Sequence, residues 1–158
     1  MKKKNEFKIV FIGTNCAGKT NIINRFISNK YDENSGPTTV SFSSRQFELE
    51  FELYTINIFD TVGASAFRKL VKIYLPDSDG VVVVYDITNK NSFDEIDEYI
   101  KSSKEVENNE IPMIVIGNKP NLYEIRNVTE EEGELKAKKY GAEFIETSAL
   151  SGENIEKA

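Results

Sequence analysis

The chain has 158 residues, 39% hydrophobic and 29% charged, which fits one globular domain over residues 1–158 with a hydrophobic core of its own. Its net charge of -6 argues against a protein that binds nucleic acid by electrostatic attraction. The chain has no histidine, which excludes histidine catalysis and histidine-ligated metals. Its single cysteine, Cys16, excludes an internal disulfide and favours a reducing, intracellular setting.

In the first half of the chain, a strand, a loop and a helix are followed by two more strands. Residues 7–13 form a short apolar run, and residues 19–28 carry apolar side chains at helical spacing. Residues 46–51 and 54–59 alternate apolar and polar side chains. This alternation predicts two antiparallel strands, with Phe51 inside the first of them, although no Asn-Gly or Asp-Gly turn joins the two.

In the second half, strands and helices alternate, which predicts a mainly parallel sheet covered on both faces. Three segments are predicted strands: 80–86, 112–118 and 143–149. Two S/T-x-x-E capping boxes, Ser92–Glu95 and Thr129–Glu132, predict where two helices begin. A further helix is expected from Ser151 onward. The fold class is therefore α/β.

The loop between the first strand and the first helix has the pattern G-x-x-x-x-G-K-[ST] of a phosphate-binding loop. It reads Gly13, Thr14, Asn15, Cys16, Ala17, Gly18, Lys19 and Thr20. In such a loop, backbone N–H groups and the helix N-terminus surround the phosphates of a nucleotide. Lys19 would neutralise the β- and γ-phosphate oxygens, and the Thr20 hydroxyl would coordinate Mg²⁺.

A second phosphate-related motif, "DTVG" at 60–63, follows an apolar strand. Asp60 is a candidate to hold the metal through a water molecule, as an acid at the end of a strand does in many nucleotide-binding proteins. The loop and this aspartate occur in many classes of nucleotide-binding enzyme, so the choice among these classes depends on the remaining motifs.

Five ordered motifs resemble those of the Ras-like small GTPases, and within them the Rab branch. They are "GTNCAGKT" at 13–20, "PTT" at 37–39, "DTVG" at 60–63, "GNKPN" at 117–121 and "ETSAL" at 146–150. The Rab character comes from "YDITNKNSF" at 85–93 and from three aromatic residues, Phe42, Phe59 and Tyr74, which match the Rab effector-contact trio. The resemblance implies a small G domain with six strands, one of them an antiparallel edge strand, and five helices.

The resemblance also implies guanine nucleotide, GTP or GDP, with Mg²⁺, and two switch loops that respond to the γ-phosphate. Thr38, favoured over Thr39 by its distance from Lys19, would complete the metal shell, and the Gly63 N–H would contact the γ-phosphate. The base site would comprise Tyr31, Asn118, Lys119, Asn121, Ser148, Ala149 and Leu150. Effector and exchange proteins would bind at the switch regions.

Two departures from the family concern hydrolysis. Ala64 stands where efficient members carry the glutamine that orients the attacking water, and Ser65 replaces a glutamate. A methyl group cannot position water, so we expect intrinsic hydrolysis slower than the family norm by about one to two decades. Asn15 replaces a small residue beside the γ-phosphate. It either blocks the arginine of an activating protein or points to solvent.

A third departure concerns the base. Asn121 replaces the aspartate that accepts two hydrogen bonds from guanine, and its amide offers one acceptor and one NH₂ donor group. The mismatch with the guanine amino group would cost about 2–4 kcal/mol, or about 30- to 1000-fold in affinity. Xanthine, with a carbonyl at that carbon, would match Asn121 better. The alternative is that the other contacts keep enough affinity for guanine.

The chain end also departs from the Rab pattern, because it stops at Ala158 with no prenylatable cysteine. Either the sequence is a fragment of a longer protein or the protein does not anchor itself by a lipid, and we expect the last helix to be truncated. The first functional hypothesis is a Rab-like switch in vesicle trafficking, cytoplasmic and associated with endomembranes, that hydrolyses GTP feebly. The second is a pseudo-GTPase interaction module with weak, xanthine-tolerant or no nucleotide binding.

Overall fold

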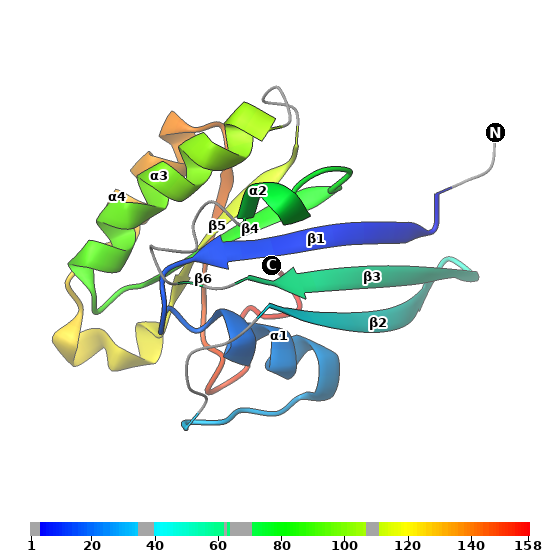
Figure 1. The fold of residues 1–158 in the computed structure, drawn as a ribbon. Helices are drawn as coiled ribbons and strands as arrows, with labels where there is room; N and C mark the ends of the chain where they lie inside the picture. The colour runs from blue at the N-terminus through cyan, green and yellow to red at the C-terminus, as the bar shows by residue number, and fades with distance from the viewer. Residues whose placement is uncertain (1–3, 35–39, 62, 64–70, 107–110) are drawn as a thin grey trace.

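The computed structural model describes residues 4–34, 40–61, 63, 71–106 and 111–158 of the chain. They form one twisted sheet with helices on both of its faces (Figure 1). Among the helices that the structure describes, none has both the length and the apolar character that crossing a lipid bilayer requires.

The sheet has six strands in the order β2-β3-β1-β4-β5-β6. Edge strand β2 pairs antiparallel with β3, and every other neighbouring pair is parallel. The strands are β1 (Glu6–Gly13), β2 (Ser41–Leu49), β3 (Glu52–Asp60), β4 (Gly80–Asp86), β5 (Met113–Asn118) and β6 (Glu143–Thr147). The predicted α/β fold, with one antiparallel edge strand, is confirmed.

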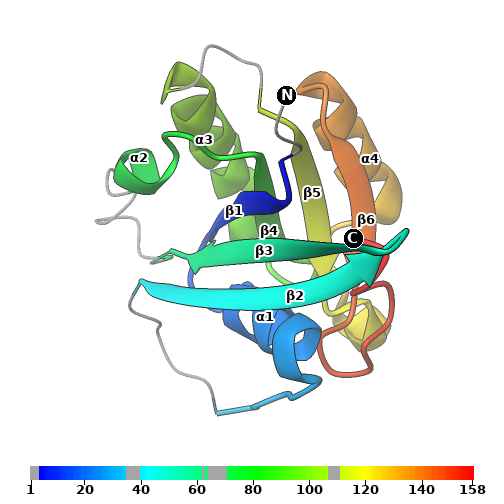
Figure 2. The ribbon, with the colours of Figure 1, turned by 90° about the vertical axis from the view of Figure 1, so that its right-hand side faces the viewer.

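The helices form a layer on each side of the sheet, with α1 on one face and α3 and α4 on the other (Figures 1 and 2). They are α1 (Lys19–Ser28), α2 (Val71–Tyr74), α3 (Lys90–Val106) and α4 (Glu130–Lys139), with a 3₁₀ helix, η2 (Pro120–Ile125), before α4. The capping box of Thr129 and Glu132 is present at the start of α4, as predicted.

The predicted capping box of Ser92 and Glu95 is wrong. Helix α3 begins at Lys90, and the side chain of Asn89 caps it by accepting the Ser92 N–H at 3.2 Å. The Ser92 hydroxyl instead donates to the carbonyls of Asn89 and Asp86, at 2.7 and 3.2 Å. Because asparagine caps helices as well as serine does, the sequence offered two candidate starts one turn apart.

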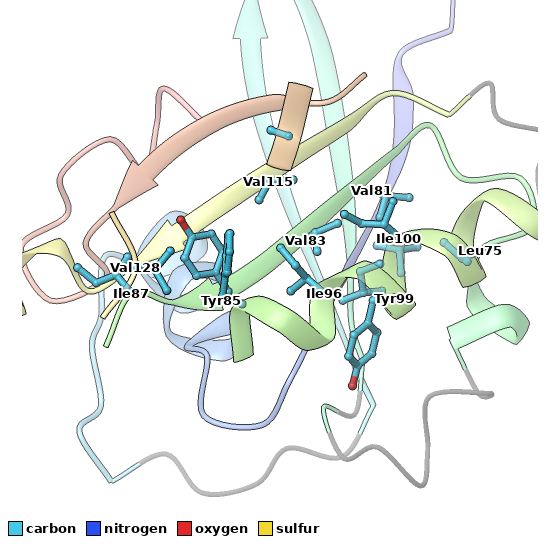
Figure 3. Packing of buried hydrophobic residues seen from close by; sticks show 14 residues of the cluster. Leu75, Val81, Val83, Tyr85, Ile87, Ile96, Tyr99, Ile100, Val115 and Val128 are labelled. Carbon is cyan, nitrogen blue, oxygen red and sulfur yellow. The ribbon is translucent and has the colours of Figure 1, made fainter. Parts of the chain in front are cut away.

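The larger hydrophobic core lies between the sheet and the layer of α3 and α4 (Figure 3). Tyr85 of β4 packs edge-on against Phe93 of α3, with ring centroids 4.9 Å apart. Ile96, Tyr99 and Ile100 of α3 are fully buried against the strands. This packing fixes α3 beside the carboxyl end of β4, close to the loop that follows β1.

The opposite face of the sheet is only partly covered. Ile22 and Ile23 of α1 and Ile155 pack there against Phe11 and Ile58. Beside them, an apolar groove of about 470 Å³ runs along the sheet between α1 and the last residues of the chain. Residues from β1, β3, β4 and β5 form its floor.

The predicted helix from Ser151 onward is absent, and residues 151–158 form turns instead. Gly152 and Asn154 have φ angles of 84° and 59°, which are incompatible with a right-handed helix. The first turn of a helix is costly, and an eight-residue segment with two left-handed positions has too few hydrogen bonds to offset that cost.

The β2–β3 hairpin is confirmed, but its turn falls one residue pair earlier than the sequence predicted. β2 ends at Leu49, so Phe51 lies in the turn with Glu50 rather than in the strand. Both turn residues have positive φ, 51° and 65°. A two-residue hairpin turn of this geometry normally carries Asn-Gly, and Glu50 and Phe51 stand there instead.

Candidate functional site

The phosphate-loop motif follows the carboxyl end of β1 and closes against the ends of β4 and β5. Gly13 has φ 140°, and a Cβ there would lie 2.2 Å from the Val84 carbonyl oxygen. Gly18 has φ 99°, and a Cβ there would lie 2.0 Å from Asn118 Nδ2. Both glycines are therefore required for the loop to pack this closely on its neighbours.

Lys19 is the first helical residue after the loop and is buried, with 6% of its surface exposed. Its Nζ donates to the carbonyl oxygens of Gly13 and Thr14 at 2.9 and 2.8 Å. No carboxylate among the described residues lies within ion-pair distance of it. Burial lowers the pKa of Lys19 to about 8, and the charges of Asp60 and Cys16 oppose this shift only in part. Within the described part of the chain, the loop thus holds a buried cation that forms no ion pair.

Asp60, at the end of β3, lies beside the first turn of α1. The Thr20 hydroxyl donates to Asp60 Oδ2 at 2.5 Å, while Oδ1 is buried and has no partner among the described residues. Burial raises the pKa of Asp60, and the hydrogen bond from Thr20 and the charge of Lys19 oppose the rise. A hydroxyl and a carboxylate with a free lone pair fit the oxygen donors that Mg²⁺ takes alongside phosphates and water.

Gly63 packs directly against the phosphate loop. Its carbonyl oxygen accepts the Asn15 N–H and the Tyr99 hydroxyl, both at 3.0 Å. A Cβ at Gly63 would lie 2.4 Å from Asn15 N and 2.7 Å from Lys19 Nζ, so only glycine fits. Tyr99 is fully buried on α3. The sequence analysis missed it, because its helical spacing marks it only as a core residue.

The end of β5 is tied to the phosphate loop by two side chains. Asn118 is buried and donates through Nδ2 to the Ala17 carbonyl at 2.9 Å, which leaves its Oδ1 without a partner among the described residues. Lys119, with φ 69°, reaches back to the Cys16 carbonyl at 2.9 Å.

Asp86, at the end of β4, fixes the position of Lys119. Its Oδ2 accepts Lys119 Nζ at 2.5 Å, and its Oδ1 accepts the backbone N–H and the hydroxyl of Thr88. The motif "YDITNKNSF" contains this aspartate, so the sequence marks it as a candidate. Its contact with Lys119 depends on the pairing of β4 with β5 and could not be predicted from the motif.

The "ETSAL" segment forms the other side of this region. Ser148 donates its hydroxyl to Asn121 Oδ1 at 3.1 Å and accepts the Ser151 N–H at the same distance. Arg25 of α1 donates to the carbonyls of Ala149 and Leu150, at 2.8 and 2.5 Å. Arg25 was missed by the sequence analysis, since a basic residue in the last turn of a helix is ordinarily explained by the helix dipole.

Of the remaining residues predicted for the nucleotide site, the structure describes only Tyr31. Tyr31 lies after α1 with 36% of its surface exposed, and it makes no hydrogen bond or ring contact with the described site residues. Thr38, its neighbour Thr39, Ala64 and Ser65 lie outside the residues that the structure describes.

The three aromatic residues matched to the Rab trio form one contiguous surface. Phe42 of β2 packs edge-on against Phe59 of β3 at 5.2 Å between ring centroids, and Phe59 lies 6.1 Å from Tyr74 of α2. Phe42 is 58% exposed. The Lys8 ammonium lies 5.1 Å from the Phe59 ring centroid, a distance at which a cation–π contact contributes.

The described residues contain no cluster of three or more His, Cys, Asp or Glu side chains that could bind a metal by themselves. A cation at Thr20 and Asp60 would thus depend on further oxygen donors, such as phosphates. In a comparison with protein-family models, residues 8–158, nearly the whole chain, match the model described as the Ras family.

Proposed function

Because the chain belongs to the Ras family of GTP-binding small GTPases, we propose that it is a Rab-like switch in vesicle trafficking that binds GTP or GDP with Mg²⁺ and hydrolyses GTP very slowly. The observation that carries the nucleotide site is a pair of buried groups beside one glycine-rich loop. Among the described residues, the Lys19 ammonium has no carboxylate at ion-pair distance and Asp60 Oδ1 has no hydrogen bond. A buried charge without a partner destabilises a fold, and a phosphate with its cation would compensate both groups.

In this proposal, the backbone N–H groups of residues 13–18 and the Lys19 ammonium hold the phosphates. Thr20 and Thr38 would ligate Mg²⁺ directly, and Asp60 through water. Bound there, the cation would neutralise charge on the β- and γ-phosphates. The Gly63 N–H would contact the γ-phosphate.

We assign the base to the surface between β5 and the "ETSAL" segment. Asn118 has a free acceptor, Oδ1, and its donor secures the loop at Ala17. The Lys119 stem would cover one face of the base and Tyr31 the other. The Ala149 N–H would donate to the O6 carbonyl of guanine, held in place by Arg25 through the Ala149 carbonyl. Ser148 and Leu150 would complete this wall.

Slow hydrolysis follows from Ala64, because attack on the γ-phosphate needs a positioned water and an alanine side chain has no group to orient one. The Rab assignment is supported by the contiguous surface of Phe42, Phe59 and Tyr74, which we propose as the effector surface. Effector and exchange proteins would bind there, at the cytoplasmic side of endomembranes.

A second candidate function is an interaction module with altered base preference, and one contact favours it. The Ser148 hydroxyl already donates to Asn121 Oδ1, which leaves the Asn121 NH₂ group to face a base. An NH₂ group opposes the guanine amino group but pairs with the carbonyl of xanthine. Xanthine nucleotides would then bind at least as tightly as guanine nucleotides.

Competition titrations with GDP, XDP and ADP in the presence of Mg²⁺ test the proposal. We expect GDP to bind most tightly, and Asn121→Asp to strengthen GDP binding by about 30- to 1000-fold by restoring the second acceptor. Tighter binding of XDP than of GDP would favour altered base preference. Failure of all three nucleotides to bind would contradict the switch and favour the interaction module.

A further inference from the structure

The β2–β3 hairpin ends in a group of exposed apolar side chains. Leu49 and Leu53 are 55% and 56% exposed, and Phe51, between them, is 97% exposed. We call residues 48–53 the acidic hairpin tip. An almost fully exposed phenylalanine beside two half-exposed leucines is unfavourable in water, since none of the three gains the stabilisation of burial.

The backbone conformation at the tip is energetically unfavourable as well. Glu50 and Phe51 have φ angles of 51° and 65°. Left-handed conformation is rare for any residue with a Cβ, and a bulky residue such as phenylalanine is a clear outlier there. Asn-Gly would form the same turn with little strain. Residues held in strained conformations concentrate at functional sites, so both local costs at Phe51 point to a use for this side chain.

The charged side chains of the tip itself all have one sign. Glu48, Glu50 and Glu52 alternate with Leu49, Phe51 and Leu53, and residues 46–60 contain no lysine or arginine. The carboxylates of Glu48 and Glu50 form no hydrogen bond or ion pair with any described residue. A second acidic tip and an anionic membrane would both be repelled by this charge.

We propose that the acidic hairpin tip is a docking site for a partner protein that presents an apolar pocket ringed by lysine and arginine. Phe51 fills the pocket, and Glu48 and Glu50 pair with the basic rim. An exposed aromatic side chain surrounded by polar groups is the usual anchor of an interface, and complementary charge selects the partner.

This surface lies at the opposite end of the sheet from the nucleotide site (Figures 1 and 2). β3 begins at the tip, beside the amino end of β1, and the phosphate loop follows the carboxyl end of β1. Docking at the tip therefore does not require nucleotide. A chain that binds no nucleotide can therefore still bind a partner at the tip, and the two proposals can fail independently.

The test uses a fluorescent helical-hairpin peptide that has a leucine-lined groove between its two helices and lysines along the rim of the groove. It is titrated against the whole chain with and without GDP–Mg²⁺. We expect saturable binding that does not depend on nucleotide and is weakened at least tenfold by Phe51→Ala. Glu48→Gln with Glu50→Gln should weaken it several-fold, with less effect at higher salt. The matched control, Glu131→Gln, Glu134→Gln and Leu135→Ala on α4, removes the same charge and an equally exposed leucine, and should leave binding unchanged.

A second variant separates folding from docking. Glu50→Asn with Phe51→Gly should raise the Tm by roughly 5 °C, because the turn is relaxed, while peptide binding is lost. The proposal is overturned if the peptide does not bind, or if the α4 control loses as much binding as the tip variants do. It is also overturned if a peptide with glutamates in place of its lysines binds equally tightly. It is also overturned if Phe51 drives co-sedimentation with phosphatidylserine vesicles, which would make the tip a membrane contact.

Discussion

Lys19 is a buried cation at the phosphate loop, and its removal separates nucleotide binding from folding. We expect Lys19→Met to lower GDP affinity by at least about 100-fold, since a charged hydrogen-bond donor to phosphate is lost. The unfolding free energy of the nucleotide-free protein should change by less than about 1 kcal/mol, because relief of the buried charge offsets the lost bonds to Gly13 and Thr14. Lys30→Met, at an exposed position, is the control for both measurements. Normal GDP affinity of Lys19→Met would contradict the proposed site.

We propose that Ala64 limits the rate of hydrolysis. We expect Ala64→Gln to raise single-turnover phosphate release from bound GTP by about 10- to 100-fold, because a carboxamide can orient the attacking water. GTP affinity, measured in parallel, should be unchanged. If the native chain already releases phosphate at a rate normal for the family, another group positions the water and the proposal of slow turnover fails.

Tyr99 reaches the nucleotide site from within the core. Its hydroxyl and the Asn15 N–H together hold the Gly63 carbonyl against the loop, beside Lys19. We expect Tyr99→Phe to cost about 1 kcal/mol of unfolding free energy and to raise the ratio of GTP to GDP affinity several-fold, since Gly63 is then freer to turn its N–H toward the γ-phosphate. Tyr123→Phe, at an exposed tyrosine, should change neither quantity. If the ratio of GTP to GDP affinity is unchanged in Tyr99→Phe, the hydrogen bond from Tyr99 contributes to stability alone.

Between elements, Asp97 joins α3 to α4. It accepts Lys136 Nζ at 2.8 Å and the Tyr140 hydroxyl. Burial alone would raise the pKa of Asp97, but these hydrogen bonds outweigh it and hold the pKa below its usual value. A carboxylate with a lowered folded-state pKa stabilises the fold above its unfolded pKa, and this stability is lost as pH falls through the folded value.

We therefore expect Asp97→Asn to lower the unfolding free energy by about 1–2 kcal/mol at pH 7, and the difference from the native chain to shrink steadily below pH 4. Denaturant unfolding of both chains at several pH values measures this difference in unfolding free energy. Asp94→Asn removes an exposed carboxylate that lies 4.0 Å from Lys90, and serves as the control. A difference that does not shrink at all below pH 4 would mean that the substitution disturbs packing rather than charge.

The regular elements were predictable from sequence because their signals are local. Apolar runs located β1, β4 and β5, and the capping box of Thr129 located α4. The errors have local causes too. Asn89 competes with Ser92 as the cap of α3, the turn at Glu50 and Phe51 lacks its preferred residues, and two left-handed residues exclude a helix after Ser151.

For the whole molecule, only part of the candidate site could be predicted. The phosphate loop is continuous in sequence, so its pattern suffices. Asp60, Asn118 and Ala149 meet it only because parallel strands end at one edge of the sheet. The contacts of Arg25 and Tyr99 depend on how helices pack, which periodicity does not specify. The roles of Thr38 and Ala64 stay predictions.

A guanine-nucleotide switch that retains GTP should carry this nucleotide through purification. The most direct test is to denature the freshly purified chain and to identify the released nucleotide by chromatography. We predict close to one guanine nucleotide per chain, most of it GTP, because phosphate and Mg²⁺ compensate Lys19 and Asp60 and Ala64 slows hydrolysis. Bound nucleotide that is mostly GDP would contradict slow turnover. A chain that releases no nucleotide would contradict the switch itself.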